Sequence, residues 1–275
     1  MRSQLVINAD DFGYFDGVSE GILEAIDAGI VTATGVMANA PGFERWAAAL
    51  LKHPEADVGV HLNATYGEPL TPAMRTALAF NDHRMPPKGT LALHVMTGRI
   101  PVATLADEWR AQIERCRAAG LTLRFLNSHE HVHMHPRLYP SIKQLAREFN
   151  VPFVRHTHAE FDFPLTASSA LRAVMVSALS ALQTGMERTP KLLGVAPSGR
   201  LNIGYMQRML SRLQAGKNYE LMCHPGHDDA IAAADPALRR YHDWTGELRC
   251  LLSREFRDAL QARAVRTIRF RDLLA

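Results

Sequence analysis

Residues 7–13, INADDFG, decide the fold that we predict for this chain. The apolar run Gln4–Ala9 has the pattern of a buried strand, and it ends at two adjacent carboxylates, Asp10 and Asp11, shortly before a glycine. Parallel α/β proteins place their catalytic residues where the strands end. On these residues alone, a capped turn after a strand is the better interpretation, so other motifs have to decide whether the acids are functional.

Strand and helix patterns alternate along the rest of the chain. The predicted strands after the first are Ile30–Met37, Ala56–Leu62, Leu121–Asn127, Val151–Arg155, Tyr219–Cys223 and Val265–Phe270. The predicted helices are Gly17–Ala28, which Asp16 would cap, Phe43–Lys52, Leu105–Ala119, Pro136–Asn150 and Trp244–Ala264. This alternation predicts a parallel sheet with right-handed crossovers.

Most of the chemically active side chains fall at the carboxyl ends of predicted strands. They are Asp10, Asp11, His61, His129, Arg155 and His224. Because barrel enzymes assemble their sites on this rim, we predict an α/β fold, a distorted (β/α) barrel of seven or eight mostly parallel strands. No glycine fingerprint follows the first strand, so a dinucleotide-binding fold is the weaker interpretation.

A single domain spanning residues 1–275 is the predicted organisation. A chain of 275 residues could form one large domain or two small ones, and no linker divides it. We expect loop excursions near residues 64–103 and a helical segment rich in Ala, Leu and Met near residues 165–216. Such loops often cover a site, although a plain surface insertion explains them equally well.

Composition excludes several classes of protein. Hydrophobic residues make up 47% and charged residues 21% of the chain, which argues against disorder and coiled coil. The net charge of +3 is small and the basic residues are dispersed, so we expect no nucleic-acid partner. The cysteines are isolated, which fits a reducing compartment, and no apolar run is long enough to be a transmembrane segment. With no signal peptide expected before the first strand, the predicted location is cytoplasmic.

Four of the 13 histidines lie in SHEHVHMHP, residues 128–136: His129, His131, His133 and His135. An extended segment would place all four on one face, whereas a turn would spread them. They cannot all bind one ion. A lone buried histidine is more often a hydrogen-bonded core residue than a ligand, but four after a strand, with acids at another strand end, favour a metal site.

One carboxylate and two histidines would form an open metal site, with coordination positions left for water and substrate. A bound dication lowers the pKa of its water from about 15.7 towards 7. Two neighbouring carboxylates do not easily perform the same task, so one as ligand and one as general base is the simplest division. The sequence therefore indicates a metal-dependent hydrolase.

Two further residues could assist such a reaction. His224, in the motif MCHPG, could protonate a leaving amine because imidazole titrates near neutrality; packing beneath Pro225 is the alternative. Arg155 could orient a carboxylate such as Asp10, although a surface ion pair is nearly as good an explanation. Glu68 lies on a predicted rim loop, where substrate contact and plain solvation cannot be separated.

Five motifs occur in a familiar order: NADDFG, GVHLN at residues 59–63, YGEPL at 66–70, SHEHVHMHP, and ELMCHPG at 220–226. Together they resemble the YdjC-like carbohydrate deacetylases, over nearly the whole chain. The resemblance implies a polysaccharide-deacetylase-like barrel that removes the acetyl group from an N-acetylated amino sugar or oligosaccharide. Relatives often have histidine in place of Glu130 and an apolar residue in place of His135, so the particular sugar is not predicted.

The resemblance also implies residue roles. It assigns the metal ligands to Asp11, His61 and His129, the general base to Asp10, and the acid to His224. The cofactor would be one divalent ion, Mg²⁺ or Zn²⁺, and the assembly a homodimer. We add, as residues that bind or orient the substrate, Arg155, Glu68, His131 and His133.

Two other functions stay open. The chain could be a non-catalytic metal- or sugar-binding protein on the same barrel. Iron(II) oxygenases also use two histidines and one carboxylate. Those enzymes generally have HxD/E spacing on all-β scaffolds, whereas here the carboxylate precedes the first histidine by about 50 residues on an α/β pattern.

Overall fold

The computed structural model describes residues 2–158, 160, 174, 176–181 and 189–274. In this part of the chain, eight strands form one sheet in which every pairing is parallel. The strands are β1 (Gln4–Phe12), β2 (Ala33–Val36), β3 (Asp57–Leu62), β4 (Leu123–Ser128), β5 (Phe153–Val154), β6 (Lys191–Leu193), β7 (Asn218–Cys223) and β8 (Arg266–Thr267). Their order is β5-β4-β3-β2-β1-β7-β6, with β8 beside β1. The predicted distorted parallel barrel is confirmed.

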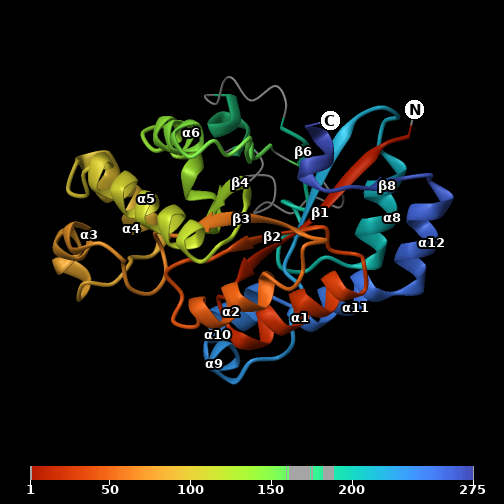
Figure 1. The fold of residues 1–275 in the computed structure, drawn as a ribbon, viewed down its shortest axis with the longest axis horizontal. Coiled ribbons are helices and arrows are strands. Elements are labelled where there is room, and N and C mark those ends of the chain that lie inside the picture. The colour runs from red at the N-terminus through yellow and green to blue at the C-terminus, as the bar shows by residue number, and fades with distance from the viewer. Residues whose placement is uncertain (1, 159, 161–173, 175, 182–188, 275) are drawn as a thin grey trace.

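Strand β1 lies in the interior of the sheet, between β2 and β7 (Figure 1). It pairs with β7 from Gln4 to Ala9 along one edge, so β2 and β8 share its other edge. Side chains of β1 alternate between two cores, as a strand buried on both faces requires. Leu5 and Ile7 join the larger core, while Val6 joins a smaller aromatic cluster. Asn8 and Asp10 share the parity of Val6 and therefore belong to this second, inner face.

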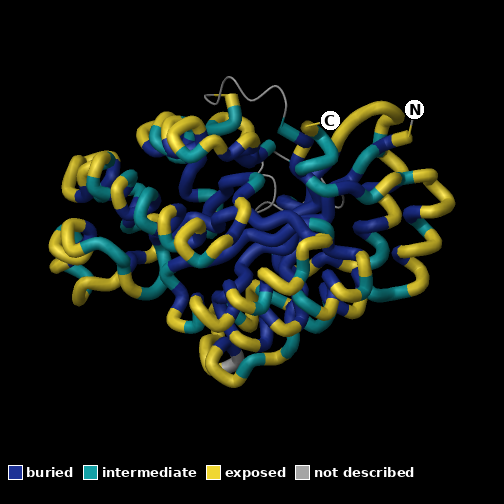
Figure 2. The backbone as a smooth tube through the Cα atoms, in the orientation of Figure 1, coloured by how far each residue is buried: buried dark blue, intermediate teal, exposed yellow. Residues whose placement is uncertain are grey.

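Helices surround the buried sheet. They are α1 (Asp16–Asp27), α2 (Phe43–Leu50), α3 (Pro72–Ala77), α4 (Lys88–Thr97), α5 (Val102–Ala118), α6 (Tyr139–Glu148), α8 (Ile203–Ser211), α9 (Ala230–Ala234), α10 (Pro236–Tyr241), α11 (Trp244–Leu252) and α12 (Arg254–Ala262). In Figure 1, α1, α2 and α11 lie along one side and α6 along the other, with α3 to α5 at one end and α8 and α12 at the opposite end. Figure 2 shows that burial concentrates in the strands and exposure on the outer helices.

Several predicted boundaries are wrong near the C-terminus. The single helix expected over Trp244–Ala264 is two helices, because Ser253 adopts an extended conformation and its hydroxyl accepts a hydrogen bond from the N–H of Phe256, which caps α12. The strand expected over Val265–Phe270 is reduced to β8, and the 3-10 helix η3 (Phe270–Leu273) follows it.

The cap predicted for the first helix is also wrong. Phe15 holds the N-cap position of α1 and makes no side-chain cap, while Asp16 lies inside the helix. The carboxylate of Asp16 instead accepts hydrogen bonds from Trp46 and Arg45 of α2. These contacts tie two neighbouring helices together.

The two regions expected to depart from the barrel contain regular structure. Residues 64–103 hold α3, α4 and the short 3-10 helix η1 (Ala79–Asn81). Much of the helical segment expected near residues 165–216 lies outside the described residues. In its described part, α8 fits the expectation, but Lys191–Leu193 forms β6, which pairs with β7 and was not predicted. A run of three residues is too short to show a strand period.

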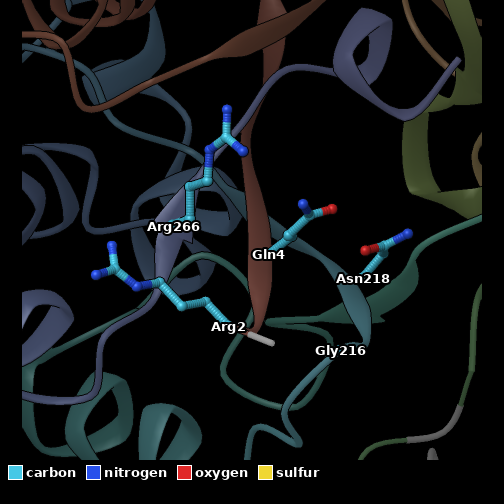
Figure 3. Close-up of a pocket in the computed structure, with 5 residues that line it drawn as sticks. All are labelled: Arg2, Gln4, Gly216, Asn218 and Arg266. Atoms are coloured by element: carbon cyan, nitrogen blue, oxygen red, sulfur yellow. The ribbon is translucent and has the colours of Figure 1, made fainter. Parts of the chain in front are cut away.

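A hollow of about 650 Å³ lies at the amino-terminal ends of β1, β7 and β8. Figure 3 shows its lining residues, and the guanidinium groups of Arg2 and Arg266 point in different directions. Of the predicted site residues, Asp10, Asp11 and His224 lie at the opposite ends of β1 and β7. In the described ranges, no helix has the length and apolar character needed to cross a membrane.

Candidate active site

Three predicted metal ligands meet at the carboxyl end of the sheet. Asp11 lies near the end of β1, His61 lies on β3, and His129 directly follows β4. Oδ1 of Asp11 is 3.1 Å from Nε2 of His61 and 2.8 Å from Nδ1 of His129. One possible ligand atom from each residue lies within 4.8 Å of the other two. The cluster therefore has the donor set of an open divalent-cation site.

An irregularity in β1 lets both aspartates reach the site. Neighbouring side chains in a regular strand point to opposite faces. The pairing of β1 with β2 changes register between Ala9 and Phe12, and Asp11 has a φ of 69°. This left-handed conformation is uncommon for residues other than glycine. Both carboxylates consequently lie near one ring: His61 Nδ1 is 3.7 Å from Asp10, and its Nε2 is 3.1 Å from Asp11.

Asn127 orients the ring of His61. The two residues are direct cross-strand neighbours in β4 and β3. Nδ2 of Asn127 donates to Oδ1 of Asp10 at 2.8 Å, so the amide oxygen faces Nδ1 of His61, also at 2.8 Å. Nδ1–H of His61 therefore donates to the amide oxygen, and the lone pair of Nε2 is available to a cation.

Gly35 of β2 leaves space for this pair, and its replacement tests the importance of the ring orientation. A Cβ at this position would lie 3.2 Å from Cβ of His61 and 3.3 Å from Oδ1 of Asn127. We expect Gly35→Ala to displace the ring and to weaken divalent-metal affinity about tenfold, as measured by isothermal titration calorimetry. Gly89→Ala is the control, because a Cβ there would meet nothing within 4 Å. Equal affinities of the two variants would contradict the prediction.

Asp10 also belongs to a second buried network, around Arg155. Arg155 forms a bidentate pair with Asp10 through Nη1 and Nη2, and its Nε and Nη2 donate to Oε1 of Glu220. Nδ2 of Asn8 donates to both carboxylates, at 3.1 Å to Asp10 and 3.0 Å to Glu220. All four residues are buried. One guanidinium therefore lies between two acids in the interior of the barrel, as buried charges require partners.

Charges in and around this network control the pKa of each acid. Burial alone would raise the pKa of Asp10, but Arg155 and His61 outweigh burial and lower it to about 2. At Asp11, burial is outweighed by His129 and His61, so the pKa lies well below its usual value. Burial raises the pKa of Glu220 even though Arg155 opposes the shift. Asp10 and Asp11 are therefore both ionised near neutral pH.

His224 lies beside this network on the next strand. Cys223 of β7 pairs with Ala9, so His224 follows at the level of Asp10. Its backbone N–H donates to Oε2 of Glu247 at 2.6 Å, and burial raises the pKa of this glutamate. The acid role predicted for His224 stays a prediction.

The histidine-rich segment forms a turn rather than an extended run. His129–Met134 is the 3-10 helix η2, interrupted at Glu130 and His131, which have φ of 53° and 55°. Of its histidines, His129 alone joins the Asp11 cluster. The ring of His135 points elsewhere and accepts from the N–H of Arg137. Because the segment turns, histidines that alternate in the sequence do not share one face in the structure.

The two middle histidines of this segment form hydrogen bonds with Arg155 and Thr157. Ser128 Oγ–H donates to Nδ1 of His133 at 2.6 Å, and Nε2–H of His133 donates to the carbonyl of Arg155 at 3.1 Å. His133 is fully buried, so its position fits orientation of Arg155 better than contact with substrate. Nδ1 of His131 and Oγ1 of Thr157 form a hydrogen bond of 3.2 Å. Burial and Arg155 lower the pKa of His131 well below its usual value.

Glu68 is an exposed residue of the loop after β3. Its carboxylate pairs with Arg75 at 3.0 Å and with Arg84 at 3.7 Å, and all three side chains are more than half exposed. Its carbonyl accepts from Asn39, which also contacts Asn63. Glu68 therefore stands apart from the acids and histidines at the strand ends, and its substrate role stays a prediction.

Sequence reasoning missed Asn8, Asn127 and Glu220. Each stands in a buried stretch of its strand and follows a buried apolar or aromatic residue. Buried amides and acids need polar partners, so their presence in such runs is itself a signal that the strand borders a polar network. That rule could have identified Glu220, although it could not have named Arg155 as its partner.

Comparison with known proteins places the chain in one family. A family model described as "YdjC-like protein" matches residues 4–262. A carbohydrate deacetylase from Geobacillus stearothermophilus is 32% identical over 234 residues, which cover 85% of this chain and 84% of that protein. One from Listeria welshimeri is 29% identical over 277 residues, covering 98% and 100%. A solved structure from Enterococcus faecalis, provisionally named a cellobiose-phosphate cleavage protein, has the same fold, with a TM-score of 0.78, 23% identity and 99% of each chain covered. The chain therefore belongs to the YdjC-like protein family.

Proposed function

We propose that this protein is a metal-dependent deacetylase that removes the acetyl group from an N-acetylated amino sugar or oligosaccharide and releases acetate. The observation that carries the proposal is the separation of two adjacent acids. Asp11 contacts His61 and His129, while Asp10 is held by Arg155. One acid is thus available as a metal ligand and the other as a general base. The relatives named carbohydrate deacetylases support an acetylated sugar as the substrate.

Asp11, His61 and His129 would hold one divalent ion, Mg²⁺ or Zn²⁺. A carboxylate oxygen and two imidazole nitrogens within 4.8 Å of one another fit such an ion, and mixed N/O ligation suits several metals. When bound, the ion supplies a water of lowered pKa and stabilises the developing oxyanion of the amide. The hydrogen bond from His61 to Asn127 keeps Nε2 directed at the ligand position.

Asp10 is suited to accept the proton of the attacking water. Within the described residues, its Oδ1 accepts hydrogen bonds from Arg155, Asn127 and Asn8, whereas its Oδ2 accepts one, from Arg155. Each carboxylate oxygen has two lone-pair directions, so Oδ2 keeps one free. We assign proton abstraction to Oδ2 for this reason. His224 would then protonate the departing nitrogen, which leaves as the free amine when its bond to the acetyl carbon breaks.

Loss of a ligand should remove metal and activity together. We expect Asp11→Ala and His129→Ala to lose the stoichiometric ion, because two remaining donors do not hold a divalent cation firmly. Inductively coupled plasma mass spectrometry measures the metal, and acetate release measures activity. Asp27→Ala is the control, since Asp27, His53 and Glu55 form a group with similar spacing in which both acids are exposed. If Asp27→Ala lost the ion and Asp11→Ala kept it, the metal site would be the group of Asp27, His53 and Glu55 and not the Asp11 cluster.

The function itself is tested by incubating the metal-loaded protein with a panel of N-acetylated mono- and oligosaccharides. Mass spectrometry detects the loss of an acetyl group, and an enzymatic assay detects acetate. Release from at least one sugar supports the proposal. No release from any sugar, with metal bound, would favour the non-catalytic interpretation. Oxygen consumption with a 2-oxo acid would favour an iron oxygenase.

A further inference from the structure

A stack of aromatic rings lies against His224. His242 is nearly parallel to Trp244, with ring centroids 4.7 Å apart and an interplanar angle of 8°. The same ring meets His224 at 5.3 Å and 63°. His224 follows β7, whereas His242 follows α10 and Trp244 begins α11, so the contact joins two distant segments. None of the roles assigned above uses His242.

Three nitrogens of this stack are buried and unsatisfied. Nδ1 of His224, Nδ1 of His242 and Nε1 of Trp244 have no hydrogen-bond partner within the described part of the chain. Buried polar atoms nearly always have partners, and a buried water commonly serves about three such groups at once. The chemistry of the three atoms is complementary. Indole N–H can only donate, whereas a neutral imidazole offers one donor and one acceptor.

We propose that His242 is a positioning residue for His224 and acts through one ordered water molecule. His224 Nδ1–H and Trp244 Nε1–H both donate a hydrogen bond to this water, and the water donates one to Nδ1 of His242. All three buried nitrogens then have a partner, because the water accepts from Trp244 and His224 and donates to His242. The proton on Nδ1 keeps the ring of His224 in one orientation and leaves Nε2 as the nitrogen that faces the amine. This inference rests on the proposed function.

The surrounding charges favour a neutral His242. Burial and the neighbouring His224 lower the pKa of His242 to about 3. A neutral ring can accept a hydrogen bond, which a protonated ring cannot. The titratable groups that act on the pair from other elements are Asp10 and Asp11 of β1, His129 of η2 and Glu247 of α11. All but His129 are acids.

The test is His242→Phe, which keeps an aromatic ring against Trp244 and removes the nitrogens. We expect kcat for acetate release to fall about tenfold with KM and metal content unchanged. The basic limb of the pH profile should move to lower pH by about one unit, because the protonated acid loses an acceptor. His242→Asn supplies an acceptor oxygen and should restore the limb. His94→Phe is the matched control, since Nδ1 of His94 is also buried without a described partner and its ring packs against Phe80.

A second readout does not depend on the sugar. Nuclear magnetic resonance of the imidazole signals gives the titration midpoint of His224, which should be lower in His242→Phe than in wild type and unchanged in His94→Phe. A wild-type protein that releases no acetate would contradict the proposed function and leave this readout intact. The inference would be overturned if folded His242→Phe had the same titration midpoint of His224 and the same basic limb of the pH profile as the wild type. If His242→Phe does not fold, the basic limbs of His242→Asn and His242→Ala are compared. A basic limb at lower pH in His242→Ala than in His242→Asn supports the inference, and equal limbs overturn it.

Discussion

Asp10→Asn should lower kcat on an N-acetylated sugar about a thousandfold, within the range that general base catalysis supplies. The substitution preserves the size of the side chain but removes the charge that takes a proton from water. The ligand cluster does not include Asp10, so metal content should stay at the wild-type level. Steady-state kinetics and metal analysis of the same preparation measure the two effects.

Asp57→Asn is the matched control for this variant. Asp57 is also buried and ion-paired, with Arg271, but it lies at the amino-terminal end of β3. We expect this control to lose stability and to keep turnover. Full turnover of Asp10→Asn would show that another group is the base, while loss of metal from it would show that Asp10 acts as a ligand.

Arg155→Met should produce the largest loss of stability. The guanidinium is the cation that pairs with both Asp10 and Glu220, and all three residues are buried. Removing one partner of a buried ion pair leaves an uncompensated charge, which costs about 3–5 kcal/mol in the free energy of unfolding. Urea unfolding followed by circular dichroism measures the loss. The control Arg45→Met removes an arginine whose pairs with Asp16 and Glu20 are exposed, so its effect should stay below about 1 kcal/mol.

The pH dependence of this loss has a defined sign. In the wild type, the pKa of Asp10 is lowered to about 2, so its ionised form stabilises the folded protein above pH 4, an effect lost as the pH falls towards 2. Without Arg155, burial acts on Asp10 and Glu220 with less opposition, and their pKa values should rise. Protonation of these two acids then stabilises the folded variant. The difference in the free energy of unfolding between wild type and variant should therefore shrink as the pH is lowered from 7 to 4. A difference independent of pH would show that packing, not charge, explains the loss.

Strand periodicity and strand-end chemistry were sufficient to predict much of the molecule. Alternating strand and helix patterns predicted the parallel sheet, because the period of apolar residues reflects local backbone geometry. The ends of these strands share one edge, so Asp11, His61 and His129 could be expected near one another before any coordinates were known. Their assignment as ligands came from the family resemblance and stays a prediction until metal is measured.

Short or interrupted elements were predicted poorly. β6 has three residues, and the break at Ser253 depends on one side-chain cap, so neither produces a period. The turn at His131 is a second example. Alternating histidines are compatible with an extended run, and the positive φ values that separate them become favourable through packing against neighbouring elements.

The amino-acid sequence alone determined the alternation of strands and helices, and it determined which acids and imidazoles stand near the ends of the longer strands, since these features depend on local residue order. The tertiary structure decided which of those groups contact one another. Strand alternation would send Asp10 and Asp11 to opposite faces, but the register change in β1 brings both to His61, and Arg155, from a strand far along the chain, takes hold of Asp10. Partners such as Glu220 and His242 act through burial and distance across the barrel, which no order of neighbouring residues encodes.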